Sequence, residues 1–476
     1  MGYTLNMLIK TEELSDNFLK LMIECELADY SNVKGSMIYL PYTYSMWEEI
    51  QKQLDQRFKK TGVLNVYFPL LIPYSAIEKE KEHLEGFAPE LALVTHAGGE
   101  KLEDPLVIRP TSETIICDYF SKHIKSWRDL PFKINQWVNV LRWEKRTFPF
   151  LRNSEFLWQE GHTVHATYKE ADKEALDKLN IYKEILENYL CISGIVGKKS
   201  KGERFAGADT TYTFETLMKD GKAVQVCTSH NLSDNFAKVF DIKYQDKNKE
   251  NKYVYQTSWG ISMNRSLGSM FLSLIDNSGL VIPPSIAPYQ VVIIPIFNQE
   301  TEKRVLDFLD ILLTKLENIR VYVDNNTDKT PGYKFNYYEK KGIPIRIEVG
   351  IKEVNNDEIV LVRRDTLEKK SIKLDKIDIS LYLEDIQKNM LNKSKMFLEE
   401  NTHEVSSFGE FSKVLKDQRG FIFAYFCESE KCEKEIKEQT LATVRCIPFN
   451  LDDTIEGKCI YCKNDTKIKA YFAKSY

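Results

Sequence analysis

The sequence predicts an α+β protein in three parts: a large domain around an antiparallel sheet, a smaller α/β domain, and a small α+β domain at the C-terminus. Two alternating runs flank a turn signal at Asp220-Gly221, strands alternate with helical stretches after the proline-rich residues 278–288, and five of the nine cysteines lie beyond residue 426. A chain of 476 residues is also too long for one compact core. We therefore expect domains at residues 1–285, 286–390 and 391–476.

The first part opens with an expected helix followed by a strand. After Pro41, apolar residues recur every four positions from Met46 to Phe58, and Gly62 follows two lysines. This spacing predicts an amphipathic helix with a basic last turn and a glycine stop. Residues 64–73 form an apolar run with β-formers and two prolines, which favours an edge strand.

Later segments give the rest of the expected architecture. Residues 209–226 predict a hairpin, and hairpins in series indicate an antiparallel sheet rather than a doubly wound nucleotide-binding fold. Residues 278–288 hold three prolines in eleven positions and are typical of a linker. Beyond them, strands alternate with helices as far as about residue 390, and a helix rich in Lys and Glu near 383–401 leads to the cysteine-bearing tail.

Composition excludes several classes of protein. The 66 basic and 70 acidic residues nearly cancel, which argues against a chain that coats nucleic acid without specificity. No apolar run is long enough to cross a bilayer and no secretory signal is visible, so we expect a cytoplasmic protein with reduced thiols and no membrane partner. Two basic clusters, the C-terminal lysines and the set Lys198, Lys199, Lys201 and Arg204, are interpreted as solvated surfaces.

Residues 139–165 place several arginines, glutamates and histidines among strand-forming aromatics. The sequence has no G-x-x-x-x-G-K-[ST] loop and no G-x-G-x-x-G after a strand. ATP, if it binds, must therefore be held without a glycine-rich phosphate-binding loop. Arg142 and Glu144 alternate, and we expect both side chains on one face of a strand, where a planar guanidinium suits phosphate. A half-exposed hairpin with cross-strand ion pairs is the alternative.

The C-terminal cysteines form two short pairs that bracket a loop. Four residues separate Cys427 from Cys432, and two separate Cys459 from Cys462. This spacing predicts a closed structural Zn²⁺ site with four thiolates, in which the metal stabilises rather than catalyses. Buried reduced thiols are the alternative, and Cys446 is expected to stay outside the site.

Ordered motifs give the sequence a family resemblance. It resembles class II aminoacyl-tRNA synthetases, and the text around the motifs is similar to prolyl-tRNA synthetases of the archaeal and eukaryotic-like type, from about residue 25 to the end. The motifs are TGVLNVYFPLLIP (61–73, with Pro69), EGFAPELALVTHAGG (85–99), VIRPTSETI (107–115), FLWQEGHTVH (156–165), QVCTSH (225–230), YQTSWGISMNR (255–265), PGYKFNYYEKKGIPIRIEVG (331–350), GKCIYC (457–462) and the closing YFAKSY.

The resemblance implies a fold in which ATP lies bent over an antiparallel sheet, and it assigns the nucleotide contacts. Arg142 and Arg265 are implied as the catalytic residues, Arg142 on the α-phosphate and the substrate carboxylate and Arg265 over one face of adenine. Further ATP contacts are implied for Glu144 (adenine amino group), Phe156 (stacking), Arg152 (outer phosphates), Gln225 and Thr228 (nucleotide, with Gln225 toward Mg²⁺), Asn153 and Ser262.

The same resemblance implies a pocket for L-proline. Thr111 and Glu113 would accept from the secondary ammonium, and Arg142 would take the carboxylate. The wall and its supports would be Phe87, Trp158, Glu160, His162 and His230. Such a pocket separates proline from alanine weakly, and fewer than a hundred residues lie between the second and third motifs, too few for an editing insertion. We therefore expect alanine misactivation.

The sequence departs from the family pattern in three places. The stretch from Arg142 to Arg152 is one residue short, and Asn153-Ser154 replace Thr-Arg. SMNR replaces Ser-Thr-Arg in the third motif, and Cys227 replaces a glycine, where a thiol would be reactive if its pKa were lowered. These changes affect the expected ATP contacts but remove no charged catalytic group.

The resemblance also implies partners and leaves two alternatives open. It implies tRNA(Pro) as the second substrate, an anticodon-binding role for the α/β domain, and a homodimer built through the first motif. A non-catalytic paralogue that binds tRNA is one alternative, although Arg142, Glu113 and Arg265 are all present. A class II enzyme for another amino acid is the second, disfavoured by the motifs around Thr111 and Trp158.

Overall fold

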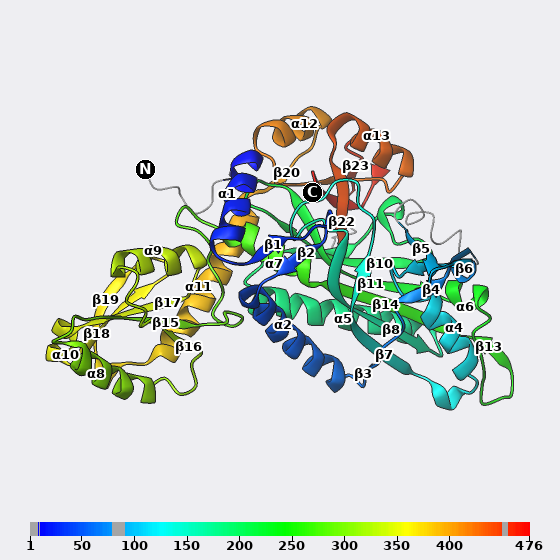
Figure 1. Cartoon of the computed structure of the whole chain (residues 1–476). Coiled ribbons are helices and arrows are strands. Elements are labelled where there is room, and N and C mark those ends of the chain that lie inside the picture. Colours follow the sequence, from blue (N-terminus) through cyan, green and yellow to red (C-terminus); the bar gives the residue numbers. More distant parts are fainter. Residues whose placement is uncertain (1–7, 9, 79–90, 450–455) are drawn as a thin grey trace.

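A computed structural model describes residues 8, 10–78, 91–449 and 456–476. Its largest element is an 11-stranded sheet in the order β20-β21-β25-β22-β9-β10-β11-β14-β8-β7-β3. As Figure 1 shows, this sheet fills the larger lobe, and a second lobe with its own sheet lies beside it. The predicted α+β fold class is therefore confirmed.

Five antiparallel strands make the centre of the sheet. β7 (Phe132–Leu141) pairs with β8 (Glu155–His165), β8 with β14 (Tyr255–Ser262), β14 with β11 (Ala223–Ser233), and β11 with β10 (Thr210–Leu217). The predicted hairpin is the β10–β11 pair, and Gly221 in its turn has a φ of +75°, a conformation that glycine adopts without strain. Hairpins in series thus build the sheet as the sequence predicted.

Helices cover the sheet and close the main core. α2 (Pro41–Lys60) is the helix predicted after Pro41 and ends before Gly62, and its apolar face, including Phe58, packs near Trp259 of β14 with ring centroids 4.7 Å apart. α5 (Tyr168–Asn188) contributes Tyr182 to the same core, and α7 (Met263–Leu274) follows β14 directly. Since β14 runs straight into α7, residues at this junction are fixed by both the sheet and the core.

The predicted edge strand at residues 64–73 is divided in two. β3 (Leu64–Asn65) lies at the end of the large sheet, beside β7, as expected for an edge. β4 (Leu71–Pro73) instead joins a three-stranded sheet with β6 (Glu100–Ile108) and β5 (Ala92–Ala97). A proline has no N–H to donate, so the Pro69 region interrupts the ladder between the two short strands.

The α/β lobe follows the proline-rich linker. Residues 278–288 form no helix or strand, as predicted, yet Leu280 and Ile282 are buried in the main core. Beyond them, the sheet has the order β16-β15-β17-β18-β19, with parallel pairing at β15. The bounds are β15 (Val291–Ile296), α8 (Glu302–Thr314), β16 (Val321–Val323), α9 (Pro331–Lys341), β17 (Ile345–Gly350), α10 (Ile351–Asn356), β18 (Glu358–Arg363) and β19 (Lys369–Lys373).

The C-terminal part extends the large sheet instead of standing apart. β22 (Thr443–Pro448) pairs with β9 (Ile195–Lys198), which joins the two sets of strands. Residue 390 falls within α11 (Ile379–Glu400), and the predicted domain boundaries remain predictions. The other elements of this part are β20 (Thr402–Glu404), α12 (Phe408–Asp417), β21 (Phe421–Tyr425), α13 (Glu430–Thr440), β23 (Gly457–Lys458), β24 (Asp465–Thr466) and β25 (Lys469–Ala473).

A buried ion network crosses this junction. Glu215 of β10 is fully buried, and its two carboxylate oxygens accept from Lys199 (2.6 Å) and from Arg445 of β22 (2.7 Å). The prediction that Lys199 lies on a solvated surface is therefore wrong, because the chain uses it as a buried counter-ion. Removing one partner of such a network leaves an unpaired buried charge, so the network ties β22 to the central sheet.

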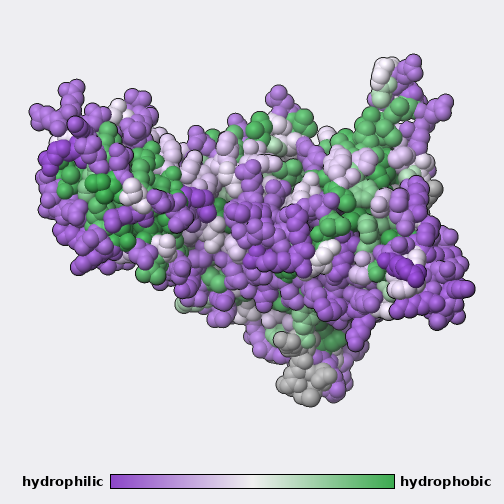
Figure 2. Space-filling view, turned by 90° about the horizontal axis from the view of Figure 1, so that it is seen from below, coloured by the Kyte–Doolittle hydropathy of each residue, from purple (hydrophilic) through white to green (hydrophobic). Residues whose placement is uncertain are grey.

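The face of the molecule seen from below is mostly hydrophilic (Figure 2). Figure 2 shows the face seen from below, where hydrophobic atoms gather in separate patches on each lobe. Within the described residues, no helix combines the length and apolar character needed to cross a membrane.

Candidate active site

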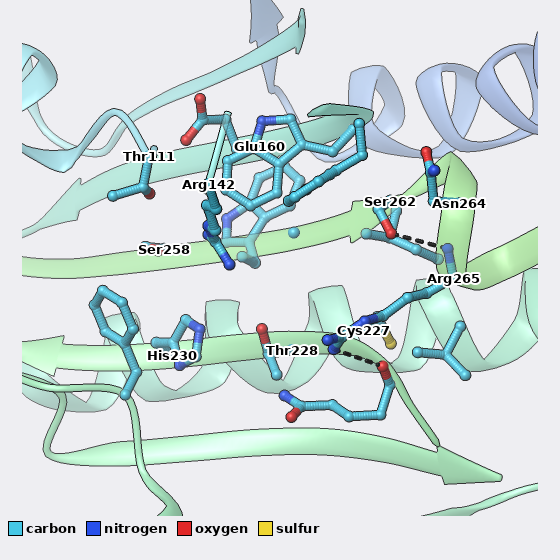
Figure 3. Close-up of a pocket in the computed structure, with 18 of the residues that line it drawn as sticks. Thr111, Arg142, Glu160, Cys227, Thr228, His230, Ser258, Ser262, Asn264 and Arg265 are labelled. Atoms are coloured by element: carbon cyan, nitrogen blue, oxygen red, sulfur yellow. Dashed lines mark hydrogen bonds between the residues drawn. The ribbon is translucent and has the colours of Figure 1, made fainter. Parts of the chain in front are cut away.

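One cavity of about 300 Å³ opens over the central strands and holds most of the side chains that the sequence selected. Its walls come from β8, β11, β14, the loop after β7 and the start of α7. Figure 3 shows Arg142 projecting toward Thr228 and His230 of β11, with Arg265 reaching the same strand from α7. The predicted residues on its wall are Thr111, Glu113, Arg142, Glu144, Arg152, Asn153, Phe156, Trp158, Glu160, Gln225, Thr228, His230, Ser262 and Arg265.

Arg142 and Glu144 lie in a loop, which corrects the prediction of a strand face. β7 ends at Leu141, and only one further ladder bond follows, from the Arg142 N–H to the Ser154 oxygen at 2.8 Å. The loop over 142–154 then leaves the sheet, so the alternation of side chains no longer applies.

The Arg142 guanidinium is held from two sides. Its Nε donates to the carbonyl oxygen of Pro110 at 3.0 Å, and its Cζ lies 5.5 Å from the ring centroids of both Phe156 and Trp158. An arginine held by one carbonyl and two aromatic faces has a fixed guanidinium plane, and a guanidinium suits an anion.

Glu144 and Arg152 form an ion pair at the cavity wall. Arg152 Nε lies 2.7 Å from Glu144 Oε2, and the Arg152 side chain is 46% exposed while that of Glu144 is 15% exposed. Because the Arg152 side of this pair is exposed to solvent, the pair contributes little to stability, and Arg152 can exchange its partner for a ligand at small cost.

Arg265 approaches the cavity from the first turn of α7. Ser262 is the N-cap of this helix, and its Oγ accepts from the Arg265 N–H at 3.1 Å. The Arg265 guanidinium donates to the Gln225 carbonyl oxygen at 3.3 Å, which leaves the Gln225 side chain on the cavity wall. These two bonds aim Arg265 across the cavity (Figure 3).

Two departures from the family pattern lie in contact. Asn264 Nδ2 donates to Asn153 Oδ1 at 2.9 Å and also contacts the Tyr39 hydroxyl, and both asparagines are buried. A buried hydrogen bond therefore connects the altered second motif to the altered third motif. Cys227 lines the cavity as well, but burial raises its pKa well above the usual thiol value, so the possibility of a reactive thiol is not supported.

A buried acidic group forms the other half of the cavity. Glu113 Oε1 accepts from the Ser258 hydroxyl at 3.0 Å, and Glu113 Oε2 accepts from the Thr111 hydroxyl. All three residues are at least nine-tenths buried. A carboxylate with neutral donors and no cation of its own in these bonds is suited to a cationic ligand.

Glu160 anchors a second buried network behind this wall. Its Oε1 accepts from Gln136 at 2.7 Å and from the Ser112 hydroxyl, and its Oε2 lies 3.2 Å from His162 Nε2. Burial opposes the charged imidazolium, but the Glu160 bond and the charge of Glu113 outweigh it and raise the pKa of His162. The same bond holds the pKa of Glu160 low against burial.

His230 is a neutral counterpart on β11. Burial lowers the pKa of His230 to about 3, and His162 adds to that effect. Its Nδ1 lies 2.9 Å from the Thr211 hydroxyl, and its ring packs against Phe205 at 4.8 Å between centroids. The cavity wall therefore carries the neutral imidazole of His230, whereas His162, which favours the charged form, lies beside Glu160 and is not among the lining residues.

Sequence reasoning missed several residues of this site. Ser258 and Ser112 stand within recognised motifs without an assigned role, and Gln136 stands outside them. Residues 203–205 also line the cavity, and of these only Arg204 belongs to the cluster interpreted as a solvated surface. Phe87, predicted for the pocket wall, lies outside the described residues.

Comparisons with known proteins bear on this geometry. Residues 96–272 match the tRNA synthetase class II core domain of the G, H, P, S and T enzymes, 290–378 match the anticodon binding domain, and 408–476 match the prolyl-tRNA synthetase C-terminal family. The proline–tRNA ligase of Natranaerobius thermophilus is 48% identical over 98% of this chain and 97% of its own length. That of Alkaliphilus oremlandii is 50% identical over 95% and 94%.

The chain belongs to the prolyl-tRNA synthetase family.

A solved prolyl-tRNA synthetase has nearly the same fold. The crystal structure of the Cryptosporidium parvum enzyme, complexed with halofuginone and AMPPNP, has a TM-score of 0.93 at 38% identity and covers 99% of this chain and 100% of its own. In the chain described here, the segment between β8 and β14 adds β9, β10 and β11 to the same sheet. The described part of that interval holds no separate domain, in line with the prediction of no editing insertion.

The cysteine cluster has the geometry of a metal site. The sulfur atoms of Cys427, Cys432, Cys459 and Cys462 all lie within 4.8 Å of one another. A tetrahedral Zn²⁺ site with Zn–S bonds of about 2.3 Å places sulfurs roughly 3.8 Å apart. The Cys427–Cys432 and Cys427–Cys462 distances are 3.6 and 3.7 Å, so the residues fit the ion. Cys446 is buried in β22 and is not part of this cluster, as expected.

Proposed function

We propose that the chain is a proline–tRNA ligase that activates L-proline with ATP and transfers it to the 3′ end of tRNA(Pro). The observation that carries the proposal is one cavity in which the arginines Arg142 and Arg265 stand beside the buried Glu113. Cations suit a nucleotide and a carboxylate, whereas a buried carboxylate suits an ammonium group. Proline offers the carboxylate and the ammonium together.

In the ATP half, the proline carboxylate attacks the α-phosphorus and pyrophosphate leaves with the bonding electron pair. We propose that Arg142 bridges the carboxylate and the α-phosphate, where charge builds up in the transition state. Arg265 and Phe156 would hold the two faces of adenine, Glu144 its amino group, and Arg152 the outer phosphates.

The remaining ATP contacts lie on β11 and at the motif junction. Gln225 and Thr228 line the cavity beside the phosphate region, and the amide oxygen of Gln225 suits Mg²⁺, which would screen the phosphates and orient the leaving pyrophosphate. Because Asn153 bonds to Asn264 and Ser262 caps α7, we propose that Asn153 and Ser262 shape the ATP half.

In the proline half, the secondary ammonium would pair with Glu113 and Thr111, beside Trp158. Glu160, His162 and His230 would support this wall. The terminal ribose hydroxyl of tRNA then attacks the carbonyl carbon of the adenylate, and AMP leaves. Because alanine lacks only apolar ring atoms, its discrimination is worth roughly 1–3 kcal/mol per methylene, and we expect alanyl-adenylate at high alanine concentration.

The assembly and the metal belong to the same proposal. Exposed Leu64, Tyr67, Leu71 and Leu93 lie on or near β3, β4 and β5, around the first motif, and such side chains favour a homodimer there. We propose that the cysteine cluster holds a structural Zn²⁺, that the 286–390 domain binds the anticodon, and that the protein works in the cytoplasm.

Charging of tRNA tests this proposal. The purified chain, incubated with ATP, Mg²⁺, labelled proline and deacylated tRNA, is expected to form acid-precipitable prolyl-tRNA. A matched reaction with tRNA oxidised at its terminal ribose should form none. Absence of prolyl-tRNA despite proline-dependent adenylate formation would contradict the transfer step, and tRNA binding without either step would favour the non-catalytic alternative.

A further inference from the structure

The rim of the catalytic cavity beside His230 is formed by residues 203–205. The backbone N–H of Phe205 donates to the Thr211 hydroxyl at 3.1 Å, and that hydroxyl lies 2.9 Å from His230 Nδ1. The Phe205 ring packs on the His230 imidazole. The position of this rim therefore sets the environment of His230 through both a hydrogen-bond chain and a ring contact.

The C-terminal part of the chain holds the residues just before this rim. β9 pairs with β22 through Lys198 and Ile447, and a Cβ at Gly197 would lie 2.2 Å from the Ile447 oxygen, so only glycine permits this approach. The Ser200 hydroxyl donates to Glu433 Oε1 at 2.6 Å. Ser200 is fully buried and Glu433 is 7% exposed.

The Ser200–Glu433 contact is a specific one. A carboxylate is costly to bury unless it is hydrogen-bonded, and an apolar side chain would fill the same space without that cost. Gly202 lies against the same carboxylate, where a Cβ would come within 2.9 Å of Glu433 Oε2. The turn over residues 201–203 is thus shaped around Glu433, which belongs to α13 in the C-terminal part.

We propose that Glu433 is a positioning residue for the amino-acid half of the active site, acting through Ser200 on residues 200–205 and through Phe205 on His230. The inference rests on the proposed function, because it assigns His230 to the proline half. Glu144, Arg152 and Arg265, assigned to ATP, belong to other segments. Losing the contact should therefore weaken proline binding more than ATP binding.

The test uses the full chain with two variants on opposite sides of the bond. In proline-dependent ATP–pyrophosphate exchange, Ser200→Ala and Glu433→Ala should each raise the KM for proline about tenfold, with the KM for ATP within about twofold. Glu433→Gln keeps an oxygen acceptor and should stay within about threefold of the parent chain. Glu438→Ala, on the exposed face of the same helix, is the matched control and should change neither KM.

A second readout does not depend on activity. Lys201 and Arg204 are trypsin sites within the held segment, so cleavage there should be about tenfold faster in Ser200→Ala and Glu433→Ala than in Glu438→Ala. Ser200→Ala leaves α13 and Cys432 untouched, so it reports the contact even if Glu433→Ala fails to fold.

Two results would overturn the inference: equal rises in both KM values, or unchanged cleavage at Lys201 and Arg204 in Ser200→Ala. No exchange by the parent chain would instead overturn the proposed function, and the cleavage rates would still decide whether Glu433 holds the segment.

Discussion

At the scale of single residues, Arg142 is the group on which both halves of the cavity depend. It is held by the Pro110 carbonyl and by two aromatic rings, and it is proposed to bridge the carboxylate and the α-phosphate. Arg142→Ala should lower kcat/KM for proline-dependent pyrophosphate exchange by about 100- to 1,000-fold, as expected when a preorganised charge is removed.

Arg146→Ala, an exposed arginine of the same loop, is the control for that variant. It should retain exchange, and thermal unfolding should show both variants folded. Exchange by Arg142→Ala within tenfold of the parent chain would contradict the role of Arg142.

Buried histidines should make stability depend on pH. Burial lowers the pKa of His165 to about 4 and that of His230 to about 3, so the folded chain binds fewer protons than the unfolded chain below pH 6.5. The free energy of unfolding therefore decreases as the pH is lowered through that range, by up to about 1.4 kcal/mol per pH unit for each histidine. His162 acts in the opposite sense: its raised pKa adds stability at low pH that is lost as the pH rises through that value.

His165→Gln tests this dependence away from the cavity. Between pH 4 and 6.5, the substitution should reduce the slope of the free energy of unfolding against pH by up to about 1.4 kcal/mol per pH unit. Urea unfolding at a series of pH values measures this slope. His96→Gln, at an exposed position of β5, controls for the loss of an imidazole. An unchanged slope in His165→Gln would show that His165 is protonated in the folded chain.

Residues of the site were predictable where a short motif carries them. Thr111 and Glu113 are two positions apart, as are Trp158 and Glu160, and the structure brings all four to the cavity. Ser258 bonds to Glu113 from 145 positions away, and no local spacing reveals such a partner. The Asn153–Asn264 contact was missed for the same reason, since it joins two motifs 111 positions apart.

At the scale of elements, the cysteine cluster links β21, α13 and the β23–β24 turn. Its four sulfurs fit a tetrahedral ion, and burial of the surrounding core depends on holding these elements together. Cys459→Ser should lose bound zinc in total-metal analysis and unfold at a lower temperature than the parent chain. Cys446→Ala removes a buried thiol outside the cluster and should retain zinc. Absence of zinc from the parent chain, purified without chelators, would contradict the assignment.

Elements with strong local signals were predicted well. α2 matches its expected start at Pro41 and stops before Gly62, and the β10–β11 hairpin follows its turn signal. Residues 64–73 were predicted less well, because two short strands in different sheets share one apolar run. Likewise, Arg142 and Glu144 alternate as strand residues do, but only the end of pairing at Leu141 shows that they lie in a loop.

At the scale of the whole molecule, the sequence predicts a separate C-terminal domain, whereas in the structure the C-terminal strands extend the large sheet. Composition changes at the linker and at the cysteine pairs, whereas the β9–β22 pairing and the Glu215–Arg445 ion pair join residues more than 200 positions apart. These contacts place the cysteine-bearing part against the rim of the cavity. The C-terminal part is therefore expected to influence catalysis as well as stability.

Amino-acid-dependent ATP–pyrophosphate exchange, run without tRNA on each of the twenty amino acids, tests the central claim most directly. Exchange with proline and a weaker signal with alanine is the predicted result, because the cavity joins the two arginines Arg142 and Arg265 to the buried Glu113. Exchange with a different amino acid, or with none in a folded and zinc-replete chain, would contradict the assignment of the cavity.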